Sequence, residues 1–335
     1  MIKCRLNPWH GVDVVMYIAC LSAALVLGMS LIAPRPEQVS CSDPALLQPY
    51  RADTISLALV LLTCVILPAP VIFLTECLTF TPHAQVLRVD ATELEMRTGR
   101  SRYRESFYSS LSLYRDLVVG MVMSYLLLEL LKVGTALPRP NFWDICGADT
   151  RMELCGGHKK LVAVDLAVNC SNPRALKWRH LADAAKSFPS GHSCFSCFIA
   201  LFLTSYYFVR LGPVNDNQRL PATCKVEDRR LPATTAVDDR RLPATALPTD
   251  VPRWYGVARR WLPLPWIVWA VVVSCSRLWD HKHHWQDVVG GAVLGLAMAA
   301  YTILVISQNF RVTRRVDNHR DAGHELNAYR VVSLG

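Results

Sequence analysis

Residues 288–308, VVGGAVLGLAMAAYTILVISQ, decide the class of fold, because this whole stretch contains no charged side chain. A helix needs about 20 consecutive apolar residues to cross the hydrocarbon layer of a membrane. A single segment inside lipid can satisfy its own backbone hydrogen bonds only as a helix. The stretch therefore predicts a transmembrane helix.

The same kind of apolar block recurs along the 335-residue chain, which is 52% hydrophobic and 19% charged. Concentration of the apolar residues in long blocks argues against two soluble domains. The blocks predict six transmembrane helices, near residues 14–33, 54–75, 116–134, 193–211, 261–277 and 288–308. We therefore expect an all-α integral membrane bundle over residues 14–308, between an N-terminal segment, 1–13, and a polar tail, 309–335.

Two of these spans need comment. Residues 14–33 follow Lys3 and Arg5, so a cleaved signal peptide is the alternative interpretation. Their apolar run is longer than the roughly 7–15 residues of a signal-peptide core, and no small-x-small cleavage site follows, which favours a retained span. The fifth span begins with Pro263 and Pro265, which a helix tolerates in its first turn.

The positive charges predict the orientation. With six spans and both termini on one side, that side carries 23 Lys and Arg residues and the other carries 12. Cytosolic loops are enriched in Lys and Arg, so we expect both termini in the cytosol. The formal net charge of +9 then requires no nucleic-acid partner, and the sequence contains no base-reading motif.

The loop at 135–190 falls on the opposite side and contains the N-glycosylation sequon Asn169-Cys170-Ser171. Such a sequon is used only in a luminal or extracellular loop, so it agrees with the charge rule. Disulfides are also permitted there. The cysteines in the predicted outer loops are Cys41, Cys146, Cys155 and Cys170. Four cysteines allow three connectivities, and the sequence leaves the pairing open.

The cytosolic loop at 213–255 contains the repeat RLPAT at 219–223, 230–234 and 241–245. A proline in every copy would remove a helical hydrogen bond each time, so we interpret the loop as a disordered, duplicated linker. A docking site or an attachment to anionic lipid headgroups is the alternative.

Three polar clusters lie at the ends of the predicted spans. The first joins Lys132 to Arg139-Pro140, the second is PSGH at 189–192, and the third runs from Ser276-Arg277 through His283 to Asp287. Spans three and four flank one outer loop, and spans five and six flank another. The six-span topology therefore predicts that all three clusters meet at the extracellular or luminal face.

These clusters resemble the three-part signature of the type 2 phosphatidic acid phosphatases, K-x6-RP, PSGH and SR-x5-H-x3-D, with every signature residue present. The local text at 41–44 (CSDP), 141–146 (NFWDIC) and 283–287 (HHWQD) is similar to the animal lipid phosphate phosphatases of that superfamily. The resemblance covers roughly residues 10–310. It implies hydrolysis of phosphatidate, lysophosphatidate, sphingosine 1-phosphate or ceramide 1-phosphate without Mg²⁺ or another metal ion.

The resemblance gives His283 the role of nucleophile, forming a phosphohistidine that water later hydrolyses. Asp287 lies four residues further on, on the same face if that segment is helical, and would keep one imidazole nitrogen protonated. His192 is the expected general acid, which protonates the departing alcohol oxygen.

A phosphoryl group in transfer spreads negative charge over its oxygens, so the site needs fixed cations and amide donors. Arginine matches two phosphate oxygens with its planar fork, and a helix N-terminus adds backbone amides. The expected phosphate-binding residues are Lys132, Arg139, Ser190, Gly191 and Arg277. Glu129 lies inside a span one turn from Lys132, and we expect the two to pair; a protonated glutamate packed in the bundle is the alternative.

Each of these assignments has a plainer alternative. The cations could be side chains that reach toward the interface from the ends of spans. His281, His283 and His284 could form a metal cluster, although no acidic or cysteine partner accompanies them at zinc-like spacing. Asp287 could cap a helix. Trp143, Trp279 and Trp285 are interpreted as interfacial aromatics, which would place the site at headgroup depth.

Two other functions remain open. A catalytically silent membrane scaffold of the same fold would have lost His192 or His283, and both are present. An enzyme of the same chemistry could act on a polyprenyl diphosphate or a sugar phosphate, and six spans disfavour the sugar phosphatases. The sequence does not rank the candidate lipids. It does not choose between the plasma membrane and the endoplasmic reticulum or Golgi, and it leaves a homo-oligomer open.

Overall fold

The computed structural model describes residues 38–79, 91–156, 161–212, 253–310, 312–315 and 329–332. This part of the chain is mostly helical and contains five helices that are long and apolar enough to span a membrane. The all-α membrane bundle is thereby confirmed. The predicted first span, 14–33, and the RLPAT repeats lie outside the described residues.

The five spans are close to the ranges that the sequence predicts. They run over Leu57–Thr79, Ser106–Thr135, Gly191–Arg210, Trp254–Trp279 and Trp285–Ile306. The first of them is assembled from α2 (Leu57–Leu61), a π-helical turn (Leu62–Ile66) and α3 (Pro68–Thr79). The second belongs to α4 (Ala91–Thr135), which starts well before the expected residue 116.

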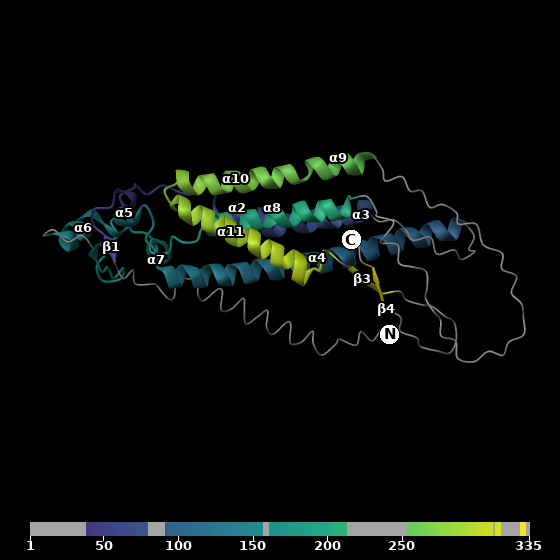
Figure 1. The fold of residues 1–335 in the computed structure, drawn as a ribbon, viewed down its shortest axis with the longest axis horizontal. Coiled ribbons are helices and arrows are strands. Elements are labelled where there is room, and N and C mark those ends of the chain that lie inside the picture. Colours follow the sequence, from purple (N-terminus) through teal and green to yellow (C-terminus); the bar gives the residue numbers. More distant parts are fainter. Residues whose placement is uncertain are drawn as a thin grey trace, which may run out of the picture.

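The remaining spans form the centre of the bundle. They are α8 (Gly191–Arg210), then α9 (Arg253–Trp261) continued by α10 (Pro263–Trp279), and α11 (Trp285–Tyr301) continued by a π-helical turn (Thr302–Ile306). The most buried of the five spans is α8, and α10 and α11 lie along it (Figure 1). Large apolar side chains on the outward faces of α10 and α11 are exposed, as expected of surfaces that face lipid.

Glycines on α11 explain why this helix lies directly against α8. A Cβ atom at Gly291 would collide with the backbone oxygen of Ser190, and a Cβ at Gly295 would collide with the backbone oxygen of Cys194. Small residues at such positions let two membrane helices approach backbone to backbone. This approach fixes the start of α11 beside the start of α8.

At one end of the bundle lies a region that we call the cap, formed by the described residues of 38–56 and 136–190 (Figure 1). It contains α5 (Phe142–Cys146), α6 (Ala148–Cys155), α7 (Trp178–Asp183), the 3-10 turn Pro44–Leu46, and β1 (Val39–Ser40) paired antiparallel with β2 (Leu161–Val162). Its own small core includes Val39, Leu46, Phe142 and Trp143.

The interpretation of Trp143 as an interfacial aromatic is wrong. Its side chain is only 2% exposed, and its indole nitrogen donates a hydrogen bond to the backbone oxygen of Ser40, 2.9 Å away. The indole serves the cap core, because the cap is large enough to bury it. Trp279 and Trp285, by contrast, are exposed at the ends of their spans.

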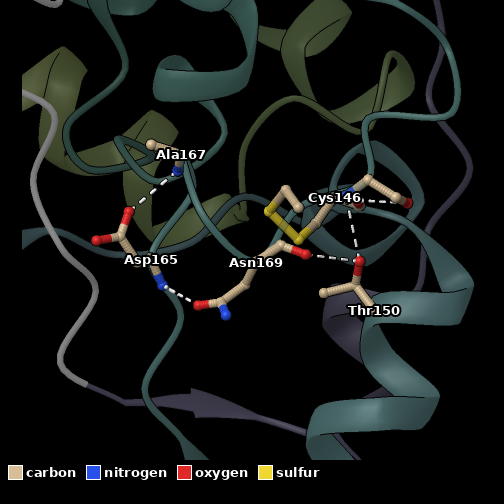
Figure 2. The surroundings of a disulfide bond; sticks show 7 residues. Cys146, Thr150, Asp165, Ala167 and Asn169 are labelled. Atoms are coloured by element: carbon tan, nitrogen blue, oxygen red, sulfur yellow. Dashed lines mark hydrogen bonds between the residues drawn. A yellow bond between two sulfur atoms is a disulfide. The ribbon is translucent and has the colours of Figure 1, made fainter.

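Two disulfides close the cap and resolve the pairing that the sequence left open. Cys41 is bonded to Cys155, and Cys146 is bonded to Cys170. Figure 2 shows the second bond beside Asn169, whose side-chain oxygen accepts a hydrogen bond from the amide of Asp165 at 2.8 Å. The backbone oxygen of Asn169 accepts a hydrogen bond from the Thr150 hydroxyl at 2.9 Å. The sequon therefore lies in an ordered turn of the cap.

The described part of the C-terminal tail contains a feature that the sequence did not predict. β3 (Val312–Arg315) pairs antiparallel with β4 (Tyr329–Val332).

Candidate active site

The three polar clusters meet where the cap joins the bundle. The backbone amide of Ser187, just before the PSGH motif, donates to the oxygen of Leu137 between Lys132 and Arg139, at 2.8 Å. The backbone amide of Ser190 donates to the backbone oxygen of Asp287 at 2.9 Å. These bonds connect the second cluster to the first and to the third, so segments about 150 residues apart along the chain converge.

Asp287 holds the third cluster together from the first turn of α11. One carboxylate oxygen, Oδ2, accepts hydrogen bonds from the amide of His284 at 2.8 Å and from the Ser187 hydroxyl at 2.5 Å. The same oxygen lies 3.6 Å from Nδ1 of His283 and 3.3 Å from Nδ1 of His284. Asp287 therefore caps α11 and faces His283 at once, so the capping alternative and the orienting role coexist.

His283 lies just before α11, which begins at Trp285. Its proximity to Asp287 therefore comes from the capping turn and not from four-residue spacing within a helix. Its side chain is buried. Because Nδ1 faces the carboxylate, Nε2 is the nitrogen whose lone pair is left for an incoming group. Burial, together with the positive charges of Arg139 and Lys132, lowers the pKa of His283 to about 4, although the Asp287 carboxylate acts in the opposite direction. The imidazole is thus neutral near pH 7, as a nucleophile must be.

Arg139 is fixed beside His283 by four contacts. Its Nε donates to the backbone oxygen of Asp183 at 2.8 Å, and its Nη2 forms an ion pair with the Asp183 carboxylate at 2.8 Å. Nη1 donates to the backbone oxygen of Lys282, the residue before His283, at 3.2 Å. Its own amide donates to the backbone oxygen of Ala184 at 2.8 Å. Although burial opposes it, the charges of Arg139, Lys132 and His283 lower the pKa of Asp183 to about 2.

Arg277 is almost fully buried, and every nitrogen of its guanidinium group is engaged. Nη1 pairs with the Asp53 carboxylate at 3.0 Å, and Nη2 contacts the Asp280 carboxylate at 2.9 Å and the oxygen of Ile55 at 3.0 Å. Nε donates to the Ser276 hydroxyl at 3.2 Å. Asp53 is the exposed member of this set, with 42% of its side chain accessible. A phosphate that reached Arg277 would have to displace Asp53.

Lys132 pairs with Glu129 one turn earlier on α4, with 3.1 Å between Nζ and Oε1. His192 lies in the first turn of α8, within electrostatic range of Arg277, His283, Asp53 and Arg139. Its Nε2 is buried and has no hydrogen-bond partner among the described residues. An imidazole nitrogen in that state is available to a group that enters the site.

The PSGH motif shapes the entry to α8. Ser190 is the residue before the helix, and α8 begins at Gly191, so its first amides face the place where the three clusters meet. The Ser190 hydroxyl is fully buried and accepts a hydrogen bond from Ser193 at 3.2 Å. A Cβ at Gly191 would only touch Leu128, so space alone does not demand glycine there.

Several residues at the site escaped the sequence reasoning. Ser187 supports Asp287, Asp183 supports Arg139, and Asp53 and Asp280 neutralise Arg277. Lys282 is buried over the ring of Tyr50 at 3.9 Å and lies 3.9 Å from Asp53; burial lowers the pKa of its ammonium group. Asp280 and Lys282 fall within the x5 spacing of the third cluster, and Ser187 directly precedes Phe188 and PSGH. Proximity to the signature residues was therefore the only sequence feature that could have indicated their role.

The histidine-rich stretch does not converge on one point. Nδ1 of His281 lies 3.2 Å from the backbone oxygen of Pro49, whereas His283 and His284 face Asp287. Across the described ranges, no group of three or more His, Cys, Asp or Glu side chains is arranged to hold a metal ion.

The geometry defines a class of site: a cluster of cationic side chains around a buried histidine and aspartate at one end of a membrane-helix bundle. The family model described as the PAP2 superfamily matches residues 113–311, which include all three clusters, and the chain belongs to this superfamily. It is 25% identical over 297 residues to phospholipid phosphatase 2 of Mus musculus, covering 89% of this chain and 86% of that protein.

Two other relatives are similar over most of their length. Phospholipid phosphatase 2 of Homo sapiens is 26% identical over 279 residues, covering 83% of this chain and 76% of that protein. Phospholipid phosphatase 1 of Rattus norvegicus is 23% identical over 318 residues, covering 95% and 91%. No solved structure matches the chain significantly.

Proposed function

We propose that this protein is a lipid phosphate phosphatase that removes phosphate from monoesters such as phosphatidate, lysophosphatidate, sphingosine 1-phosphate or ceramide 1-phosphate. One observation carries the proposal: the buried His283 lies beside the Asp287 carboxylate, with 3.6 Å between Nδ1 and Oδ2, and next to Lys282, whose backbone oxygen accepts a hydrogen bond from the Arg139 guanidinium group. The similarity to proteins named phospholipid phosphatase supports a phospholipid as the substrate.

The first chemical step is attack of His283 Nε2 on phosphorus. The N–P bond forms as the bond from phosphorus to the lipid oxygen breaks, and the electron pair of that bond leaves with the oxygen. His192, which must be protonated when the negatively charged phosphate occupies the site, gives its proton to this oxygen, so the product departs as a neutral alcohol. The imidazolium formed at His283 keeps its Nδ1 proton toward Asp287, whose negative charge stabilises it.

The second step is hydrolysis of the phosphohistidine. His192, now neutral, takes a proton from water as the water oxygen attacks phosphorus and the N–P bond breaks. Inorganic phosphate leaves, and both histidines return to their starting states. Arg139, Arg277 and Lys132 supply fixed positive charge for the transition-state oxygens, and the α8 amides after Ser190 add hydrogen-bond donors.

The proposed site faces the extracellular or luminal side. The charge asymmetry of the loops and the sequon at Asn169 support this orientation, and so do two disulfides in the cap, since such bonds persist in oxidising compartments. Exposed Trp279 and Trp285 at the ends of their spans support a site at headgroup depth, where a lipid keeps its tails in the bilayer.

The proposal can be tested with purified protein and ³²P-labelled phosphatidate in the presence of EDTA. We expect phosphate release and an acid-labile phosphoenzyme in the wild type, and neither in His283→Ala. Loss of activity on chelation would overturn the metal-independent mechanism. Residual labelling of His283→Ala would move the nucleophile to another residue.

The alternatives give different results in the same assay. A silent scaffold would release no phosphate from any ester while still binding lipid. A polyprenyl diphosphate phosphatase would turn over that substrate and leave phosphatidate intact.

A further inference from the structure

A hollow of about 420 Å³ lies between α8, α10 and α11, within the membrane-spanning part of the bundle. The α8 wall includes Cys197, Ala200 and Thr204, and the α10 wall includes Ala270, Val271 and Ser274. Small side chains on both walls leave the space open, and no charged residue lines it. We call this hollow the groove.

The groove begins directly beneath the active site. Cys197 follows His192 by five residues on α8, and Ser274 precedes Arg277 by three residues on α10. At about 1.5 Å per helical residue, its upper lining lies within about 8 Å of the site along these helices, and Thr204 lies about 18 Å below His192. From Cys197 to Thr204 the groove extends about 11 Å along α8, so it covers most of one leaflet of a hydrocarbon core about 30 Å thick.

The groove is also open to the surrounding lipid. Val271 and Ile267 line its α10 side and are exposed, as is Leu296 on α11. A tail could therefore enter from the bilayer without leaving an apolar environment. The favourable free energy of entering the groove would therefore come from close packing of the tail against its walls and not from the removal of apolar surface from water.

We infer that the groove holds a hydrocarbon tail of the lipid whose phosphate occupies the active site, and that it selects substrates by tail length. This inference rests on the proposed function. A phosphate beside His283 and Arg277 places the ester oxygen at the top of the bundle, and the chain that follows must run down one of its faces. The groove starts within about 8 Å of that position along α8 and α10, it is lined without charged residues, and it covers most of one leaflet. Its volume falls within the usual range of ligand pockets, about 300–1,000 Å³.

Val271→Trp tests the inference, because a larger side chain there fills the mouth of the groove without adding charge. Val268→Trp is the matched control: the two valines are 57% and 58% exposed on the same helix, and Val268 does not line the groove. Each variant is assayed in proteoliposomes with dioleoyl phosphatidate and in solution with the water-soluble dihexanoyl phosphatidate.

We expect Val271→Trp to raise KM for the dioleoyl lipid by about tenfold, the lower end of what one methylene of misfit costs in an apolar pocket. The dihexanoyl lipid should be hydrolysed with unchanged kcat/KM, and Val268→Trp should behave as the wild type with both lipids. An equal change for both lipids, or no change for either, would overturn the inference. A wild type that hydrolyses neither lipid would instead contradict the proposed function.

Alkylation of Cys275 provides a second measurement that does not depend on turnover. This thiol is exposed and lines the groove. A lipid-soluble maleimide should label it more slowly when a long-chain phosphonate analogue of phosphatidate is present, and a short-chain phosphonate should give no protection. Cys275→Ser identifies the signal, and equal labelling with both analogues would count against an occupied groove.

Discussion

Two groups of charged residues lie at opposite ends of α8, about 30 Å apart by helix length. At the cap end, Arg277 and Arg139 pair with Asp53 and Asp183, and each of these aspartates keeps 42% of its side chain exposed. At the far end, Arg210 pairs with Glu76 at 2.7 Å, and their side chains are 4% and 5% exposed.

The difference in exposure between these groups distinguishes a binding site at the cap end from a structural ion pair at the far end. Both carboxylate oxygens of Glu76 are used, since Ser109 donates to one at 2.6 Å and Tyr206 donates to the other at 2.9 Å, so α3, α4 and α8 are joined. At the cap end Asp53 and Asp183 are exposed enough for an anion to displace them, although Asp280, the second partner of Arg277, is as buried as Glu76. Charge at the cap end should therefore control activity, and charge at the far end should control stability.

The largest expected effect belongs to Arg277→Met. The loss of a guanidinium group that meets the transferring phosphoryl group should lower kcat by about 10³–10⁵, as for catalytic arginines in other phosphoryl transfers. Turnover of phosphatidate by the purified variant measures it. Arg51→Met is the control, because Arg51 also lies in the cap and bonds only to the backbone of Trp279 among the described hydrogen bonds. Activity of Arg277→Met within tenfold of the wild type would contradict a role at the phosphate.

Glu76→Gln should act in the opposite way. The change leaves Arg210 buried without its counter-charge, and breaking one side of a buried ion pair costs about 3–5 kcal/mol. We expect the unfolding temperature to fall clearly, while kcat per folded molecule stays unchanged. Unfolding in detergent is measured by tryptophan fluorescence. The double variant Glu76→Gln/Arg210→Met should recover part of the stability. A lower kcat at unchanged unfolding temperature would mean that the two ends are coupled.

The contrast also shows what the sequence could and could not predict. The spans were predictable because uncharged runs of this length have few alternatives in lipid, and the cap-end cations were predictable from their spacing and the order of the spans. The Glu76–Arg210 pair was not, because each residue lies alone in its local sequence, and only the packing of α3 against α8 brings them together.

The same limit applies within the site. Asp287 was assigned from its spacing to His283, but the turn that brings it there is a helix cap that the sequence offered only as an alternative. Asp53 and Asp183 come from segments far from the residues that they neutralise, so no spacing marks them. Trp143 was placed wrongly because the size of the core that the cap could build was not readable from the sequence.

A smaller effect is expected on the pH dependence of kcat/KM, and it depends on residues at the cap end alone. Burial and the charges of Arg139 and Lys132 lower the pKa of His283, so its reactive neutral form persists below the usual value near 6.5, down to about 4. Removing a cation should raise this pKa. In Lys132→Met we therefore expect the acidic limb of kcat/KM to move to higher pH by about one unit, the lower end of what a nearby charge does.

Ionisation of the substrate contributes equally to both enzymes, so the difference between their pH profiles isolates the protein group. Arg174→Met is a suitable control, since Arg174 is a cap cation that pairs with Asp144. A shift of the limb to lower pH in Lys132→Met would contradict the assignment of His283 as the group that must be neutral.

The smallest expected effect sharpens the comparison most directly, because it concerns the displaceable partner itself. Asp53→Asn keeps the shape of the side chain but removes the charge that competes with phosphate for Arg277. Because the Asp53 side chain is 42% exposed, we expect its competition with phosphate to be worth up to about 1 kcal/mol, so KM for phosphatidate and the inhibition constant of orthovanadate should fall by roughly two- to fivefold. Asp149→Asn, an exposed aspartate on α6, should leave both constants unchanged. If KM rises instead, Asp53 holds Arg277 in position as Glu76 holds Arg210, and the two ends of α8 differ less than their exposure suggests.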